Sequence, residues 1–503
     1  NNETTYGDTG TVITGKSDKN TVTIEAKDKG DKVEVKFENV NIDASSRSEA
    51  AVSVTGKGDT NIELDGDNEL KSGAGHAGLE HNKTDTSGEL TIQDKDNNGS
   101  LEAAGGFKGA GIGSAGSNDA QVKITGGNIT ATSDDWGAGI GSGSYGTGTV
   151  EITGGEINAT GGYLGAGIGG GCNGSGNVTI SGGTITAAGS DGAAGIGGGY
   201  YNGATVTITG DAVIKNASNT KYGAGIGGGN GSDGNVTISG NAKIENATGG
   251  YGAAGIGGGA FSSPDKIGNG NVVIKDNAKI DNVQGGAYGA GIGGGIYGLS
   301  NVTIEGNTKV NATGGAGGAA IGGGAGAENN SDNNGNQITI KSNENGSPTI
   351  NAVGGGTDEG EKIVIGGAGI GAGCESNADA DITLEGKVTI TATAGKDNVA
   401  IGANGIEQEF SGLAEGSSIT RYDPEGNDIT LPTDPVPAVP SSSGGSSADA
   451  SVQESVFPGL VVTDKDGQRI SYTSTQSGNT RTVCVGRLTA SLRASLAPQR
   501  QQR

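Results

Sequence analysis

A glycine-rich phrase recurs at nearly constant intervals between Phe107 and Gly405. Its fullest form runs GAGIGGG, then VTI, then a segment similar to TITATGG. Neighbouring copies are 28, 28, 28, 30, 30, 36, 29, 49 and 31 residues apart, measured between the central isoleucines Ile112, Ile140, Ile168, Ile196, Ile226, Ile256, Ile292, Ile321, Ile370 and Ile401. A near-constant period with occasional insertions is typical of stacked structural repeats whose loops differ in length.

Within one repeat the pattern has a period of two residues. Apolar and polar residues alternate in Val178-Thr179-Ile180 and in 185–187, which predicts β-strands with one buried face. A third segment, 166–168, alternates in the same way, and we expect its glycine on the outer face. A helix is disfavoured because each glycine costs about 1 kcal/mol in a helix interior.

A single repeat cannot form a hydrophobic core, so the repeats must stack. Glycine corners such as Gly161-Gly162 separate three short strands and close one triangular coil. Stacking places isoleucine on isoleucine and alanine on alanine, with coils about 4.8 Å apart. The crossover rule for parallel strands favours the right hand. The predicted fold class is therefore all-β, a right-handed parallel β-helix (β-solenoid) with about three short strands per coil.

Segments of different composition flank the regular repeats. Residues 1–106 alternate in the same way but are more charged, which indicates degenerate N-terminal coils that cap the stack. The regular β-helix covers 107–405, and a C-terminal cap covers 406–432. A linker rich in Pro, Ser and Gly spans 433–450, and 451–503 form a tail or a fragment of a further module.

The tail has two local patterns of its own. Segments 461–462 and 470–472 flank the turn-forming residues 464–467 and predict a β-hairpin. Leucines four residues apart predict a short amphipathic helix; they are Leu488, Leu492 and Leu496.

Charge and cysteine content exclude several classes of function. The 503 residues carry 32 Lys and Arg against 56 Asp and Glu, a net charge of −24, which disfavours nucleic-acid binding. No apolar stretch approaches the roughly 20 residues that span a bilayer, so we expect no membrane insertion. The three widely spaced cysteines form neither a disulfide framework nor a zinc motif. Cys172 and Cys374 occupy equivalent positions six coils apart, so we expect both to stay free.

Aromatic residues concentrate beside the glycine strand. Of seventeen in the chain, eleven lie four or five residues from a central isoleucine. Phe261 is one, and the other ten are our candidate ligand-binding residues: Phe107, Trp136, Tyr145, Tyr163, Tyr200, Tyr201, Tyr222, Tyr251, Tyr288 and Tyr297. Stacked coils would align them in two ladders beside a strip of glycine, a surface that suits sugar rings. The alternative is structural, with rings packing on each other at about 0.5–1.5 kcal/mol per pair.

The repeats resemble a known group of proteins. The segment Gly165 to Gly171, followed by 178–180 and 182–187, is similar to large secreted proteins of gut Gram-positive bacteria. Those are described as carbohydrate-binding-domain-containing or glycine-rich repeat proteins with a pectin-lyase-like right-handed β-helix. The resemblance covers about three hundred residues and implies an extracellular protein, secreted or attached to a cell surface. It supplies no catalytic motif.

A weak calcium motif lies in the N-terminal coils. Residues 94–99 match the first half of a calcium-binding loop, so Asp94, Asp96 and Asn98 are candidate metal ligands, although the twelfth position is Gly105 rather than Glu. We expect no other cofactor. Three insertions, 261–268, 325–336 and 354–362, lengthen corners beside the glycine strand, either as solvated loops or as binding loops.

Catalysis has little support. The only histidines, His76 and His81, lie in the degenerate coils. Residues 134–135 and Asp191 share a corner on nearby coils and are the best candidates for a glycosidase carboxylate pair. Rows of Thr-x-Thr type would suit ice binding, but charged residues such as Lys123 interrupt them.

We therefore expect a non-catalytic carbohydrate-binding or adhesive module that recognises extended polysaccharide or host glycan. One alternative is a structural stalk or adhesin with protein partners. The other is a polysaccharide-degrading lyase or glycoside hydrolase. The sequence leaves the sugar and the oligomeric state open.

Overall fold

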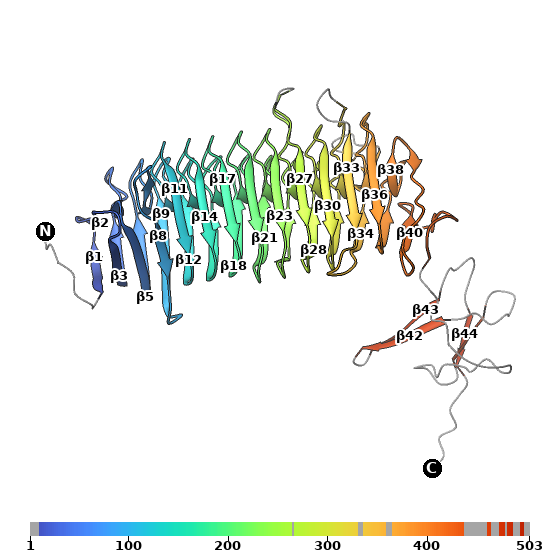
Figure 1. Ribbon diagram of the computed structural model, residues 1–503, viewed down its shortest axis with the longest axis horizontal. Coiled ribbons are helices and arrows are strands. Elements are labelled where there is room, and N and C mark those ends of the chain that lie inside the picture. Colours follow the sequence, from blue (N-terminus) through green and yellow to red (C-terminus); the bar gives the residue numbers. More distant parts are fainter. Residues whose placement is uncertain are drawn as a thin grey trace, which may run out of the picture. The chain divides into compact units, whose positions relative to one another are not determined.

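The computed structural model describes residues 10–263, 266–329, 335–358 and 365–436, together with the backbone of four short strands, β41 to β44. The chain divides into two units, Asn1–Ala438 and Val439–Arg503. The first unit is an elongated stack of coils (Figure 1). Its regular elements are all β-strands, and among the described residues we find no helix with the length and hydropathy needed to cross a bilayer.

Each regular coil contributes three strands. In the coil of Ile168, β14 (Gly148–Ile152) lies on the first face, β15 (Glu156–Thr160) on the second and β16 (Ile168–Gly169) on the third. The chain then enters β17 (Gly176–Ile180), which pairs in parallel with β14. The described chain is therefore the right-handed parallel β-helix that the repeat predicts.

The same three faces continue along the stack. The first face contains β8 (Leu90–Gln93), β11 (Asp119–Ile124), β14, β17, β20 (Ala204–Ile208), β23 (Gly234–Ile238), β27 (Gly270–Ile274), β30 (Ser300–Glu305), β33 (Asn336–Lys341) and β36 (Ala380–Glu385). The second contains β9 (Gly99–Gly105), β12 (Asn128–Ser133), β15, β18 (Thr184–Gly189), β21 (Val213–Asn219), β24 (Lys243–Ile244), β25 (Ala247–Thr248), β28 (Lys279–Gln284), β31 (Lys309–Thr313), β34 (Thr349–Val353), β37 (Thr389–Thr393) and β40 (Ser418–Tyr422).

The number of coils follows from the strands of the third face. It contains β2 (Val22–Ala26), β4 (Val52–Gly56), β6 (Leu79–Glu80), β10 (Ile112–Gly113), β13 (Ile140–Gly141), β16, β19 (Ile196–Gly197), β22 (Ile226–Gly227), β26 (Ile256–Gly257), β29 (Ile292–Gly293), β32 (Ile321–Gly322), β35 (Ile370–Gly371) and β38 (Ile401–Ala403), with β39 (Ile406–Glu407) antiparallel to β38. The thirteen parallel strands of this face correspond to thirteen coils in the described chain.

The N-terminal coils differ from the regular ones, as the charged sequence suggests. Strand β3 (Lys32–Asp43) pairs with β1 (Thr11–Ser17) and with β5 (Asp59–Lys71). Strand β5 bends around the corner and pairs with both β8 and β9, so the first and second faces merge into one 26-stranded sheet. A short strand, β7 (Asn82–Lys83), runs antiparallel to β11.

One apolar core runs through the stack because like residues lie on like residues. Val122 pairs with Val150, which pairs with Val178, and all three are at most 2% exposed. The isoleucines of the third face form another buried column, in which Ile140 pairs with Ile168. The alternating burial of the strands thus follows the period of two in the sequence.

The glycines of the third face are buried, so the expected outer strip of glycine was wrong. A Cβ on Gly167 would lie 2.7 Å from the carbonyl oxygen of Gly195 in the next coil. Gly169 adopts φ +130°, and its Cβ would lie 2.0 Å from the carbonyl oxygen of Gly197. These glycines allow the backbones of successive coils to approach closely, and they offer no exposed surface.

A buried arginine closes the C-terminal end of the core. Arg421, in β40, pairs in register with Ala392 of β37 and is 0% exposed. Its Nε donates to Asp434 Oδ2 (2.7 Å) and its Nη2 to Asp434 Oδ1 (2.9 Å), while Nη1 donates to Glu407. Two carboxylates therefore balance the one charge placed above the last apolar column.

The backbone of the second unit corrects both expectations for the tail. Strand β41 (Leu460–Thr463) pairs with β44 (Arg493–Leu496), and β42 (Tyr472–Ser477) forms a hairpin with β43 (Thr480–Val485), so the expected 461–472 hairpin is wrong. Residues 493–496 are a strand where we expected a helix, and Leu488 and Leu492 lie outside the described residues. Pairing between distant segments overrode the local spacing of four.

Candidate functional site

Two tight turns flank the third strand of each regular coil. In the coil of β16, the Gly165 N–H donates to Gly162 O (2.8 Å) and the Gly174 N–H donates to Gly171 O (2.8 Å). The third residue of each turn, Leu164 or Asn173, has a left-handed backbone with φ of 66° or 55°. Positive φ at this position is typical of type II turns, which favour glycine there.

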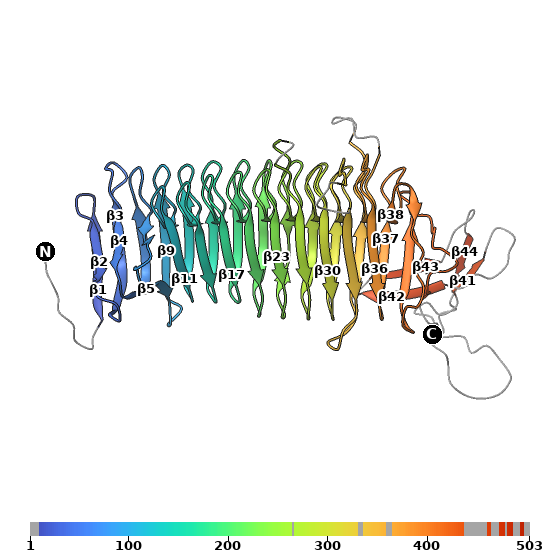
Figure 2. The ribbon, with the colours of Figure 1, turned by 45° about the horizontal axis from the view of Figure 1, so that its top comes forward.

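Hydrogen bonds stack the turns of successive coils into two columns and also join the columns. In the first column the Trp136 N–H donates to Tyr163 O (3.1 Å), and in the second the Tyr145 N–H donates to Cys172 O (2.7 Å). Between columns, the Cys172 N–H donates to Trp136 O (2.7 Å). The two columns form one continuous ridge, here called the turn ridge, which is the row of loops along the upper edge in Figure 2.

All ten candidate ligand-binding residues lie on the turn ridge. Four occupy the second position of a turn: Phe107, Tyr163, Tyr200 and Tyr251. Five occupy the third, left-handed position: Trp136, Tyr145, Tyr201, Tyr288 and Tyr297. Tyr222 lies in the first column, where its carbonyl oxygen accepts from the Ala260 N–H (2.9 Å). The expected two ladders therefore lie side by side, because the third strand between them is only two residues long.

The five aromatic residues in the third position have strained backbones. Their φ values lie between 62° and 70°. The same position in other coils is occupied either by glycine, for example Gly231, Gly252, Gly317 and Gly326, or by a non-aromatic residue that also has positive φ, for example Lys108, Ser117, Leu164 and Glu375. A non-glycine residue there costs roughly 1–2 kcal/mol, so the sequence retains aromatic rings where glycine would be more stable.

The rings contact one another but stay partly open to solvent. Ring centroids are 5.3 Å apart for Phe107 and Trp136, and 5.6 Å apart for Tyr251 and Tyr288. Six rings on the ridge are 39% to 56% exposed: Phe107, Tyr145, Tyr163, Tyr222, Tyr251 and Tyr297. Packing between rings therefore accounts for part of the arrangement and leaves aromatic surface available.

Lysines and tyrosine hydroxyls add polar groups to the ridge. The Lys108 Nζ lies 5.2 Å from the ring centroids of both Phe107 and Trp136. The Lys266 Nζ lies 4.5 Å from the centroid of Tyr201. The Tyr200 hydroxyl donates to the Tyr201 hydroxyl (2.7 Å), and burial, with that neighbouring hydroxyl, raises the pKa of Tyr200 to about 12. Tyr200 is thus a neutral hydrogen-bonding group at physiological pH.

The carboxylates proposed as a glycosidase pair are not brought face to face. Asp135 pairs with Tyr163 of the next coil in a parallel bridge, and burial raises the pKa of its carboxyl group. Asp191 forms an ion pair with Lys221 on the coil after it. The turn that carries Tyr163 lies between the two carboxylates along the stack.

The two histidines have structural partners. The His76 Nδ1 lies 2.8 Å from Glu80 Oε2. His81 is buried, with its ring nitrogens 3.2 Å from Val54 O and 3.1 Å from Gly88 O. Burial lowers the pKa of His81.

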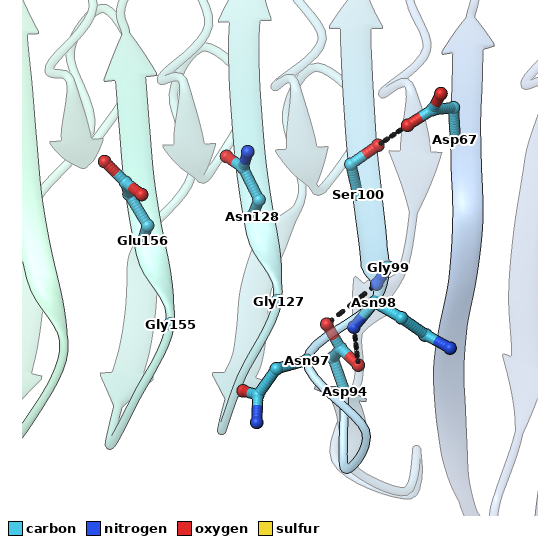
Figure 3. Close-up of a pocket in the computed structure, with 10 residues that line it drawn as sticks. All are labelled: Asp67, Asp94, Asn97, Asn98, Gly99, Ser100, Gly127, Asn128, Gly155 and Glu156. Carbon is cyan, nitrogen blue, oxygen red and sulfur yellow. Dashed lines mark hydrogen bonds between the residues drawn. The ribbon is translucent and has the colours of Figure 1, made fainter.

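The structure separates the candidate calcium ligands. Asp94 and Asn98 line a depression of about 560 Å³ on the corner between the first and second faces (Figure 3). The Asp94 carboxylate accepts the N–H groups of Asn98 (3.2 Å) and Gly99 (3.0 Å) and so fixes its own loop. Asp96 lines a different depression, of about 410 Å³. Within the described ranges, no cluster of three or more His, Cys, Asp or Glu side chains is placed to hold a metal.

Cys172 and Cys374 are buried and free, as their positions in the repeat predict. Each occupies the second position of a turn in the second column. Burial raises the pKa of each thiol to about 11. Both thiols therefore stay protonated and unreactive near neutral pH.

The fold and the turn columns define a repeat protein of the parallel β-helix class. The model of a family described as beta helix repeat matches residues 122–144, 150–172, 178–200 and 236–260. Each match begins at a buried valine of the first face and ends in the turn that follows the third strand. No curated protein and no solved structure matches the chain.

Proposed function

We propose that the turn ridge binds extended carbohydrate and that the protein is a non-catalytic extracellular binding module, either secreted or attached to a cell surface. The observation that carries this proposal is the set of aromatic residues in left-handed turn positions. Five rings occupy a position that holds glycine in some coils and a non-aromatic residue such as Ser117 or Leu164 in others, and each costs roughly 1–2 kcal/mol relative to glycine. Backbone strain of this kind concentrates at functional sites.

The shape of the ridge favours a long ligand. Its aromatic residues begin at Phe107 and end at Tyr297, and successive coils repeat at about 4.8 Å. The turns that hold the rings are hydrogen-bonded to both neighbouring coils, so the surface is organised before a ligand arrives. An extended polysaccharide can contact such a surface on many successive coils at the same time.

The polar groups of the ridge suit a sugar chain. Sugar rings present apolar C–H faces, which stack on aromatic rings, and hydroxyl groups, which need hydrogen-bond partners at the edges. The hydroxyls of Tyr200 and Tyr201 and the ammonium groups of Lys108 and Lys266 lie among the rings. The ridge therefore offers aromatic rings to the C–H faces of a sugar and hydrogen-bonding groups to its hydroxyls.

The proposal is tested by the double variant Tyr145→Gly/Tyr297→Gly. Both residues occupy left-handed positions, with φ of 65° and 62°, and are 56% and 43% exposed. Glycine relieves the backbone strain and removes the rings, so Tm should be unchanged or higher while polysaccharide binding weakens by roughly tenfold. Binding is measured on a glycan array and by affinity electrophoresis, and Tm by circular dichroism.

The matched control is Asn173→Gly, which changes the same turn position without removing a ring. It should keep wild-type binding. A large fall in Tm for the double variant, with binding to every glycan unchanged, would show that the rings act only in packing. Release of reducing ends or unsaturated products from a bound polysaccharide would overturn the non-catalytic assignment.

A further inference from the structure

The first face carries two adjacent columns of outward side chains that contain no charged residue. The columns run across β17, β20, β23, β27, β30 and β33, each of which contributes one residue to each column. Strands β30 and β33 add a third outward residue each, Glu305 and Lys341, which form an ion pair (3.4 Å) beside the columns. The first column is Asn177, Thr205, Asn235, Asn271, Asn301 and Gln337. The second is Thr179, Thr207, Thr237, Val273, Thr303 and Thr339. These twelve residues are here called the uncharged face.

The absence of charge is specific to these two columns. The preceding coils place an ion pair between Lys123 and Glu151 (3.1 Å) in the same second column. On the second face of the same coils, Lys243 pairs with Glu245 and Lys279 with Asp281. The coil geometry therefore accepts charged side chains at these positions, in a chain whose net charge is −24.

Two depressions follow the uncharged face along the axis of the stack. One, of about 330 Å³, is lined from β14, β17 and β20 by residues that include Asn177 and Thr207, with Glu151 at its β14 end. The other, of about 840 Å³, crosses β27, β30, β33 and β36; it is lined by neutral residues that include Asn301 and Gln337, and at its β36 end by Asp379 and Asp381. Because each depression spans several successive coils, a ligand that fills them lies parallel to the stacking axis.

Eleven of the twelve side chains of the uncharged face, all but that of Val273, can both donate and accept hydrogen bonds. Amide and hydroxyl groups have this double capacity, and so do sugar hydroxyls. The Asn271 Nδ2 donates to Asn235 Oδ1 (2.9 Å), which orients both amides and leaves each with further bonding capacity. Covering neutral groups costs much less than covering charges, so a neutral ligand can dehydrate this face without a large penalty.

We infer that the uncharged face is a second carbohydrate-binding surface, which takes a neutral polysaccharide chain lying along the stacking axis and held by hydrogen bonds. It lies on the first face and uses none of the aromatic residues of the turn ridge. The inference therefore goes beyond the proposed function and stands or falls separately from it.

The double variant Thr207→Lys/Thr237→Lys tests this inference. Both residues share a column with Lys123, so lysine is compatible with the fold at these positions. The two ammonium groups would have to be dehydrated under a neutral chain, so affinity should fall at least tenfold. The probes are galactomannan, xyloglucan and mixed-linkage β-glucan in affinity electrophoresis of the full-length protein. Thr186→Lys, on the second face, is the matched control and should bind like wild type.

The ridge variant Tyr145→Gly/Tyr297→Gly separates the two surfaces. If it still binds the three neutral polysaccharides and the lysine variant does not, the uncharged face is supported. Unchanged binding by the lysine variant overturns the inference and leaves the ridge proposal intact. Absence of binding to all three probes by the wild-type protein also overturns it. Thermal hysteresis in wild type that the lysine variant loses would instead assign the face to ice.

Discussion

Glycine has two roles at the residue scale, and they predict opposite effects of substitution. On the third face it permits close backbone approach, as at Gly169, where a Cβ would lie 2.0 Å from Gly197 O. At the third position of the turns it relieves positive φ, and aromatic residues replace it there in several coils. A glycine in one setting is required by its neighbours, and in the other it is one choice among several.

Gly169→Ala should therefore destabilise the protein strongly. At φ +130° any side chain is strained, and the added Cβ also collides with backbone of the next coil, which cannot move without breaking the stack. We expect the free energy of unfolding to fall by roughly 3 kcal/mol or more, measured by urea denaturation with circular dichroism. The control Gly405→Ala has φ +72° and no atom within 4 Å of the added Cβ, so it should cost only about 1–2 kcal/mol. Equal losses in both variants would contradict the close-approach role.

At the element scale, the strands are the part of the fold that the sequence predicts well. The alternation in Val178-Thr179-Ile180 predicts that the first and third side chains face inward, and the structure confirms this because Val178 and Ile180 are buried. The orientation of the glycine segment could not be predicted in this way, because glycine has no side chain whose polarity reports a face. The positive φ of residues such as Trp136 could not be predicted from the sequence either, since aromatic residues normally avoid that conformation.

The candidate site was predictable in position and not in form. The spacing of the aromatics from the central isoleucines places them beside the third strand, and all ten lie on the turn ridge. The merging of two expected ladders into one ridge depends on cross-column bonds such as Cys172 N–H to Trp136 O. Those bonds join backbone groups, which the residue types do not specify. The uncharged face could be found only after the register had aligned Asn235 with Asn271.

The N-terminal coils should be sensitive to acid because of one buried imidazole. Burial lowers the pKa of His81 below the 6.5 of an exposed histidine, so the unfolded chain binds the proton more readily. The contribution to stability is complete above pH 6.5 and is lost as the pH falls from 6.5 through the folded-state pKa. His81→Gln should flatten the dependence of Tm on pH between 7 and about 5. An identical slope in wild type and variant would exclude His81 as the cause, and His76→Gln serves as the half-exposed control.

The C-terminal cap should depend on the single arginine in β40. Arg421→Met keeps much of the side-chain volume but leaves the fully buried Asp434 and the partly exposed Glu407 without their cation. Breaking such a buried pair costs roughly 3–5 kcal/mol. We expect the amides of β37, β38 and β40 to lose protection in hydrogen exchange, while those of β14 to β23 keep it, because each coil contacts only its neighbours.

The triple variant Arg421→Met/Glu407→Gln/Asp434→Asn is the control for the cap. It removes the stranded charges together with the cation, so it should recover part of the lost protection. Loss of protection along the whole stack would contradict local unfolding and indicate a single cooperative unit.

At the scale of the whole molecule, the stack is modular because each coil repeats the contacts of the one before. Deleting residues 122–177 removes two complete coils of 28 residues, since Val122 pairs with Val150 and Val150 with Val178. Gln121 then joins Val178, and the inward and outward alternation continues across the junction. The shortened protein should fold, with the same cross-section and a length reduced by about 9.6 Å, twice the strand spacing.

Small-angle X-ray scattering measures both quantities, and circular dichroism measures the strand content per residue. The control removes residues 122–163, one and a half coils, which joins a first-face strand to a turn. Like residues can then no longer lie on like residues beyond the junction, so this variant should unfold or aggregate. If both deletions behave alike, stability does not come from matched columns. If only the whole-coil deletion folds, the number of coils, and with it the length of both proposed binding surfaces, can change without any change to the coil itself.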